Sequence, residues 1–428
     1  MVLPMTFSKI KFALYLFKTI FTNVSMQIKL LFILVFLSLF TIQSNAQVTG
    51  SDSLTNEPLN TAQNILSGNG GRITVSGYGQ IDYNQQFGDT LNHNGKMDVH
   101  RLITFFGYKF SERTFFVTEI EMEHVKEIYV EQAFIQHNIN SFLNFRAGLL
   151  LVPMGIVNEY HEPTTFNGVE RPNLDSKIIP TTWREMGVGL SGKFNDASLK
   201  YQLYLMNGFL SFDGTGVLRG TDGFRKGRQK AAESIFTQPN LSTKIDYYGI
   251  KGLKIGLAGY FGKSQSTAYE GLDLSNDNDV SQADSTIVGT SMLGIDYRYN
   301  FKGFQSRGQL IYANNTNTKA YNTYTGKDFG ESFFGYYLEV GYDLLRLFKK
   351  DYDQELTLFT RYENYDTHHS VYTDMLQNLS YDRTDITIGT GLKLANGAVL
   401  KLDYQHFTNK EESTGLINQF NAGVAVWF

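Results

Sequence analysis

The sequence predicts an all-β protein: a transmembrane antiparallel β-barrel of about 16 strands, with short periplasmic turns, long external loops and a third long loop folded into the lumen. Three observations predict this fold. Segments of about ten residues alternate apolar and polar side chains over most of 73–428, as spanning strands do. Short and long connections alternate between these segments. Residues 152–183 interrupt the alternation and contain four prolines, which forbid a regular strand ladder.

Composition narrows the class of protein. The chain has 428 residues, no cysteine and a net charge of -4. Without cysteine there are no disulfides and no thiolate metal sites, and the small charge gives no reason to expect a nucleic-acid partner. With 7 prolines, 40 glycines, 26 tyrosines and 33 phenylalanines, the composition is typical of a β protein with aromatic belts.

The N-terminal segment 1–46 predicts a signal peptide. An apolar run, Leu30–Phe40, follows Lys29 and precedes small residues at Ser44 and Ala46, which is the pattern of a cleaved export signal. Met26 is an alternative start for it. A membrane anchor is the competing interpretation, but the apolar run is short for a bilayer. Residues 47–72 are polar and predict a flexible periplasmic leader.

The barrel is predicted over 73–428. Five strands precede the long loop, the first with Ile73, Val75 and Ile81 on one face and the fourth, near Ile128–Ile139, with a less clean alternation. Two strands, near Met186–Phe194 and Ala197–Leu205, follow it directly. Nine more are predicted at Leu241–Tyr247, Leu253–Phe261, Ile287–Tyr299, Phe304–Asn314, Phe333–Leu344, Leu356–Tyr365, Ile386–Leu394, Leu400–His406 and Ile417–Phe428.

The connections support a barrel. Tight turns such as Asn195-Asp196 alternate with long polar segments such as Leu210–Pro239, as periplasmic turns alternate with external loops in bacterial barrels. Two connections strain the rule: the one around His124-Val125-Lys126 is short where a long loop is expected, and Leu345–Asp351 is long where a turn is expected. A secreted β-sandwich would share the alternation, but it does not explain the strand number, the alternating loops or the terminal Phe428.

If the apolar faces meet lipid, the polar faces line a lumen. Charged side chains cost little there, whereas at the lipid face they cost about 2–4 kcal/mol. The loop 152–183 and the facing strands are expected to form a constriction, in which charges of both signs sort solutes by size and polarity. Its candidate residues are Arg101, Glu119, Glu121, Glu123, Arg146, Glu159, Glu162, Glu170, Arg171, Arg184, Arg298 and Arg307.

Two simpler interpretations remain for these residues. Structural ion pairs can knit a loop without any selectivity. Glu159, His161 and Glu162 contain metal-ligand types, but their spacing in a loop gives little reason to expect a metal site. No catalytic motif is present, so we expect no enzyme activity, no cofactor and no metal.

Three segments resemble blocks of a known family: EIEMEHVKEIYVEQAFI, FRAGLLLVPMGIVNEYHEPTTFNGVERP and IIPTTWREMGVGLSG. They are similar to bacterial outer-membrane porins related to the phosphate-selective porin O and P family. The resemblance covers the signal, the first half of the barrel and the end, and is weak over 214–378. It implies a passive diffusion channel, a homotrimer and an inward third loop. The phosphate-specific members owe their selectivity to a ladder of arginines and lysines. In this chain carboxylates lie between the corresponding basic residues, which argues against a dedicated phosphate pathway.

The sequence therefore predicts a passive porin of the bacterial outer membrane, exported by its signal peptide, that lets small hydrophilic solutes or ions, including anions such as phosphate, diffuse through a charged lumen. Its expected partners are those solutes, outer-membrane lipid, two further copies of the chain and the barrel-assembly machinery, which would recognise the terminal Phe428. The alternatives are a structural or adhesion barrel acting through its external loops and, less favoured, an outer-membrane hydrolase.

Overall fold

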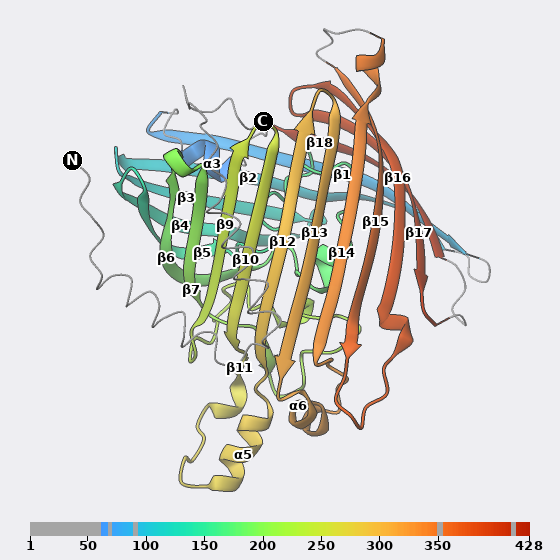
Figure 1. Cartoon of the computed structure of the whole chain (residues 1–428). Helices are drawn as coiled ribbons and strands as arrows, with labels where there is room; N and C mark the ends of the chain where they lie inside the picture. The colour runs from blue at the N-terminus through green and yellow to red at the C-terminus, as the bar shows by residue number, and fades with distance from the viewer. Residues whose placement is uncertain (1–60, 67–70, 89–92, 349–353, 412–416) are drawn as a thin grey trace. The chain divides into compact units, whose positions relative to one another are not determined.

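A computed structural model describes residues 61–66, 71–88, 93–348, 354–411 and 417–428. Sixteen strands close into one antiparallel barrel (Figure 1). They are β1 (Ile73–Gly88), β2 (Lys96–Ser111), β3 (Thr114–Glu123), β4 (Glu127–Asn140), β5 (Leu143–Leu151), β6 (Arg184–Phe194), β7 (Leu199–Met206), β9 (Asn240–Ile250), β10 (Leu253–Lys263), β12 (Gly289–Phe301), β13 (Phe304–Thr316), β14 (Ser332–Asp343), β15 (Glu355–Ser370), β16 (Asp382–Ala395), β17 (Ala398–Asn409) and β18 (Ile417–Trp427). The predicted strand number and the predicted fold class are confirmed.

The first and last strands close the ring. β1 pairs with β18 in antiparallel register, with Tyr78 opposite Trp427. The amide of Gly77 donates to the carbonyl of Phe428, and the amide of Phe428 donates back to Gly77, both at 2.9 Å. Because every strand of the ring has two hydrogen-bonded neighbours, the barrel presents no open edge to its surroundings.

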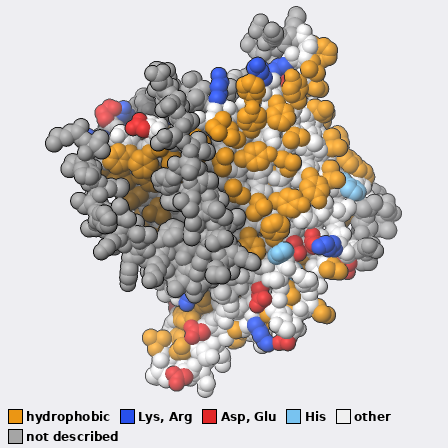
Figure 2. Space-filling model, viewed as in Figure 1, with side chains coloured by type: hydrophobic (Ala, Val, Ile, Leu, Met, Phe, Trp, Pro, Cys, Tyr) orange, Lys and Arg blue, Asp and Glu red, His pale blue; other side chains and the backbone are white. Residues whose placement is uncertain are grey.

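The apolar faces point outward and the charged faces inward. Along β15, Leu358 and Tyr362 are 48% and 42% exposed, whereas Arg361 and Glu363 between and beside them are fully buried. Figure 2 shows the result on one side of the molecule: hydrophobic side chains cover the visible strands, and charged side chains gather toward the two ends. This is the reverse of a soluble barrel. In the described part of the chain, no helix has the length and apolar character needed to cross a membrane.

Short and long connections alternate as predicted. The unusual link between β3 and β4 is a tight turn in which His124 and Val125 take φ values of 53° and 65°. The long link between β14 and β15 contains a short 3-10 helix, η4 (Leu344–Leu347). Other long connections carry the helices α5 (Asp277–Ser285) and α6 (Thr318–Thr325), seen below the barrel in Figure 1, and a two-stranded parallel sheet of β8 (Leu210–Phe212) and β11 (Gln265–Ser266).

Part of the predicted flexible leader is ordered. Thr61–Leu66 form the helix α3, and its Ala62 and Ile65 are 7% and 6% exposed. Ile65 packs against Gly107 of β2, where an added Cβ would lie 2.2 Å from its Cγ2 atom. The leader prediction is therefore corrected for these six residues, because two apolar side chains find a site inside the barrel. The predicted signal peptide lies outside the described residues.

Candidate functional site

Residues 152–183 fold into a compact unit whose two ends are clamped together. The side-chain amide of Asn158 donates to the carbonyls of Val152 and Trp183 at 2.6 and 3.0 Å, and its oxygen accepts from the amide of Trp183 at 2.6 Å. The loop contains one helical turn, α4 (Leu174–Lys177). It is predominantly buried rather than draped outside the barrel, with Trp183 and Leu174 fully inaccessible.

The loop crosses the lumen from one wall to the opposite one. On one side, Nε2 of His161 lies 3.0 Å from Oε1 of Glu119 on β3. On the other, Arg307 of β13 donates to the carbonyl of Thr165 at 2.7 Å. β3 and β13 are eight places apart in the ring of sixteen strands. The inward position of the loop, predicted from the sequence, is therefore observed in these contacts.

Charged wall residues hold the loop mainly by its backbone. The ammonium of Lys401 on β17 donates to the carbonyls of Phe166 and Gly168 at 2.5 and 2.8 Å and also to that of Pro163. Four further contacts follow the same path: Val169 N to Asp403, Leu174 N to Glu363, Asn167 to Glu339 and Asn173 to Asp385. The wall thus compensates the backbone groups of a loop that has no sheet of its own.

Besides the contacts around Lys401, a second cluster of wall and loop residues surrounds Glu159 and Tyr160. Glu159 accepts from Lys244 at 2.8 Å and from the amide of Gln202 at 2.6 Å. The Tyr160 hydroxyl accepts from Lys254 at 3.1 Å, and the guanidinium of Arg298 lies 4.0 Å from the ring centroid. Burial raises the pKa of Tyr160, but Lys254 and Arg298 outweigh it and lower the pKa to about 8. This cluster is therefore rich in cations.

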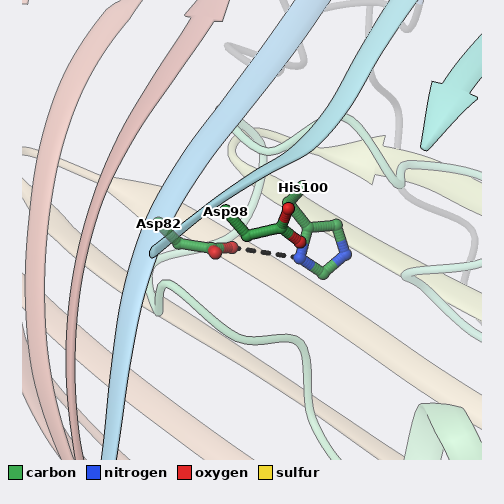
Figure 3. A group of neighbouring side chains, drawn as sticks. All are labelled: Asp82, Asp98 and His100. Carbon is green, nitrogen blue, oxygen red and sulfur yellow. Dashed lines mark ion pairs between the residues drawn. The ribbon is translucent and has the colours of Figure 1, made fainter. Parts of the chain in front are cut away.

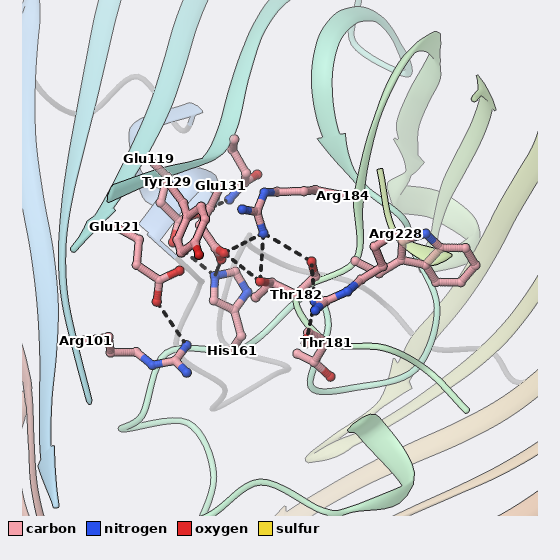
Figure 4. A network of polar contacts seen from close by, with 12 residues as sticks. Arg101, Glu119, Glu121, Tyr129, Glu131, His161, Thr181, Thr182, Arg184 and Arg228 are labelled. Carbon is pink, nitrogen blue, oxygen red and sulfur yellow. Dashed lines mark hydrogen bonds and ion pairs between the residues drawn. The ribbon is translucent and has the colours of Figure 1, made fainter. Parts of the chain in front are cut away.

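The third cluster surrounds His161 (Figure 4). Glu119 accepts from the Tyr78 hydroxyl at 2.8 Å and from Gln132 at 2.6 Å. Beside it, Arg184 donates to Glu131 at 2.7 Å. Arg101 lies 3.6 Å from Glu121. All these carboxylates are at most 3% exposed, so their ion pairs are shielded from solvent.

The predicted constriction residues separate into groups. Those that contact the loop, belong to it, or lie in the network around His161 are Arg101, Glu119, Glu121, Glu159, Glu162, Glu170, Arg171, Arg184, Arg298 and Arg307. Arg146 instead contacts Gln136 and Tyr204 on the wall. Glu123 ends β3 and lies near His124, partly exposed. Among the described residues, no hydrogen bond or ion pair joins Arg146 or Glu123 to the loop.

Glu159, His161 and Glu162 do not converge. Glu159 faces Lys244, and Glu162 accepts from the amide of Thr61 at 3.0 Å. These three side chains therefore do not face a common point.

A buried carboxyl group also lies in the helical turn of the loop. Burial raises the pKa of Asp175 in α4 to about 7, and a hydrogen bond from Gln309 opposes this rise.

Sequence reasoning missed Glu131. It is 1% exposed and lies beside Glu119 and His161. The pairing of β3 with β4 is irregular there: Glu119 faces Gln132, whereas Ile120 faces Val130, so Glu131 is an extra residue in β4. Such a β-bulge turns one additional side chain to the same face. The less clean alternation of the fourth predicted strand was its signal.

A similar irregularity occurs between β1 and β2. Gln80 faces Arg101 and Asp82 faces Asp98, which leaves one extra residue in β2. His100 there lies 3.0 Å from Asp82, near Asp98 (Figure 3). Its other ring nitrogen accepts from Arg101 at 2.8 Å. This group is partly exposed and its histidine has a partner on each side.

No family model matches the chain. A protein of Aquifex aeolicus (strain VF5), described as uncharacterized, is 32% identical over 345 residues, which cover 78% of this chain and 75% of that protein. The chain belongs to the same family as this Aquifex protein.

Solved structures share the fold. The outer-membrane channel DcaP of Acinetobacter baumannii superposes with a TM-score of 0.55 at 11% identity, covering 83% of this chain and 97% of that one. The anion-selective porin of Comamonas acidovorans gives 0.52 at 14% identity, with 83% and 99% covered. Salmonella typhi OmpF, in complex with daunomycin, gives 0.53 at 10% identity, with 83% and 97% covered. At such identities the likeness establishes a porin-like barrel and nothing more specific.

Proposed function

We propose that this protein is a passive outer-membrane porin through which small hydrophilic solutes or ions diffuse, with the loop 152–183 as its constriction. The observation that carries the proposal is the inside-out distribution of side chains on a closed ring. On β15, Leu358 is exposed on the outer face, whereas Arg361, three residues further on, is buried on the inner face. A lipid-facing exterior and a charged interior are the requirements of a membrane barrel. The shared fold with DcaP and the Comamonas porin supports the same function.

The loop supports a narrow rather than a wide pore. Wall residues that face it, such as Lys244, Arg361 and Asp403, are at most 3% exposed. A sixteen-stranded barrel without such a filler is wide enough for an aqueous channel. We therefore expect low conductance in the native protein and a marked increase when the loop is shortened.

The ion pairs in the wall support weak selectivity. Arg361 contacts Glu339 at 3.3 Å and Glu363 at 3.0 Å, and Arg307 contacts Glu339 at 3.1 Å. Basic side chains paired in this way do not form the free arginine and lysine ladder of a phosphate-specific pore. Passage of phosphate would thus be passage of one small anion among other solutes. The homotrimer implied by the resemblance stays a prediction. Cross-linking in intact membranes would measure the number of chains in the assembly.

Planar-bilayer recordings test the proposal. The wild type is expected to give small, stable current steps, and deletion of residues 164–177 is expected to enlarge them. Deletion of α5 (Asp277–Ser285) is the matched control, because that helix lies in another long connection, between β10 and β12, which the sequence predicts to be external. Reversal potentials in a salt gradient would measure selectivity. Absence of conductance in both the wild type and the loop deletion would refute the channel and favour a structural barrel that acts through its external loops.

A further inference from the structure

The network around His161 brings three buried carboxylates, those of Glu119, Glu121 and Glu131, close to one imidazole (Figure 4). The bulge at Glu131 adds a third buried carboxylate beside Glu119 and Glu121. The carboxyl groups of Glu121 and Glu131 lie against each other. Two adjacent buried carboxylates require a proton or cations nearby, and Arg184 and Arg101 are the cations that the protein supplies to Glu131 and Glu121.

Two oxygens of this network lack a donor. Among the described residues, Oε2 of Glu131 and Oε1 of Glu121 accept no hydrogen bond other than the one that the two carboxyl groups can share. Both residues are at least nine-tenths buried. Oε1 of Glu131 is already bound by Arg184. Its Oε2 therefore remains available, and it is aimed at the ring of His161, 3.6 Å from Nε2.

The histidine is oriented toward these oxygens. Nδ1 lies 3.2 Å from the carbonyl of Asn158, and because a carbonyl can only accept, Nδ1 carries the proton of this contact. Nε2 is therefore the atom presented to the wall, 3.0 Å from Glu119 and 3.6 Å from Glu131. Two ligand atoms that each lie about 2.0–2.2 Å from one tetrahedral Zn²⁺ ion are roughly 3.4 Å from each other. The distances from Nε2 to Glu119 and to Glu131, 3.0 and 3.6 Å, lie on either side of this value.

We propose that Glu119, Glu131 and His161 form a binding site for a divalent transition-metal ion, with Zn²⁺ as the best match to two carboxylates and one imidazole. The ion would join the β3–β4 wall to the loop 152–183 and hold the loop in place. The Asn158 carbonyl would orient the ligating ring, as outer-shell acceptors do at zinc sites. The competing occupants are protons, one on Nε2 that serves Glu119 and one shared by the carboxyl groups of Glu121 and Glu131, and a protein that retains no metal would favour them.

Metal binding by the full-length barrel in detergent tests the proposal. The protein is stripped with a chelator, incubated with Zn²⁺, washed, and its metal content measured by mass spectrometry. Co²⁺ loading provides a second readout, because the visible absorption of bound Co²⁺ is strong when the ion has a low coordination number. The variants are Glu131→Gln and His161→Gln, and the matched control is His100→Gln, from the other histidine–carboxylate group. Mobility of unheated samples in gels confirms that each variant is folded.

We expect about one equivalent of Zn²⁺ per chain in the wild type and in the His100→Gln variant. Both site variants should bind more than about 100-fold more weakly, since loss of outer-shell partners alone costs 10–100-fold. A wild type that retains no Zn²⁺ and shows no Co²⁺ absorption would overturn the proposal, even if the variants fail to fold. Loss of metal from His100→Gln alone would overturn it in favour of that other group. These outcomes do not depend on conductance, so the channel proposal can fail or succeed separately.

Discussion

Replacing Lys401 with methionine tests whether the barrel wall holds the inward loop. Lys401 is 4% exposed. Its ammonium group donates to three loop carbonyls, those of Pro163, Phe166 and Gly168. A hydrogen bond to a charged group contributes about 1.5–3 kcal/mol. In the variant, water that enters the lumen would replace part of the hydrogen bonding of the three carbonyls. We therefore take the free energy lost as about 3 kcal/mol, which corresponds to roughly a 100-fold shift in the equilibrium between the docked and the released loop.

Single-channel recording measures that shift as the fraction of time spent at high conductance. We expect it to rise by about 100-fold in Lys401→Met. Lys393→Met is the control, because Lys393 is about one-third exposed and its ammonium group pairs with Glu355 at 3.1 Å instead of with the loop. If Lys401→Met conducted like the wild type, the loop would be held by other contacts or would not lie in the conducting path.

The remaining predictions concern the loop clamp, the lipid face and pH. Asn158→Leu should lower the unfolding free energy by about 2–4 kcal/mol, because it leaves buried backbone groups unpaired; thermal unfolding in detergent checks this, and an unchanged midpoint would contradict the clamp. Ile388→Arg, at a position 53% exposed on the outer face, should cost about 2–4 kcal/mol in lipid vesicles, and an arginine tolerated there would show that the face does not meet lipid. The pKa of Asp175, raised by burial from 3.8 to about 7, means that the folded protein keeps a proton that the unfolded chain loses. Stability should thus fall as pH rises from about 4 to 7, and less steeply in Asp175→Asn, as unfolding midpoints at pH 5 and pH 8 would show.

The barrel was predictable because its signal is repeated. Each strand alone is ambiguous, since alternation also occurs in sandwiches. Sixteen strands with alternating connection lengths leave one fold that accounts for all of them. Even the short connection at His124 was visible in the sequence, and the structure shows a tight turn there. The inward loop was predictable for a related reason: prolines in a long segment without alternation exclude a strand.

The candidate site was less accessible to sequence reasoning. A β-bulge is one extra residue, and it changes which side chains face the lumen without changing composition. At Glu131 it turned a residue of an irregular strand into a neighbour of His161. The order of α3 was also hidden, because six residues in a polar leader carry too short a pattern to indicate a helix. Contacts between residues far apart in sequence, such as Thr61 with Glu162, leave no local trace.

The wall charges take on a different meaning once their partners are known. For candidates such as Arg307 the sequence left solute selection and a structural role both open. Several wall charges bind the loop backbone: Arg307 donates to the carbonyl of Thr165, and Lys244 donates to that of Gly155. Asp403 and Glu363 accept from loop amides in the same way. A charge that serves a backbone group fixes the path of the loop whatever side chains the loop carries. Its field is also compensated locally, so little remains to discriminate between ions. Selectivity in this barrel should therefore respond more to changes in loop position than to neutralising any one charge of the wall.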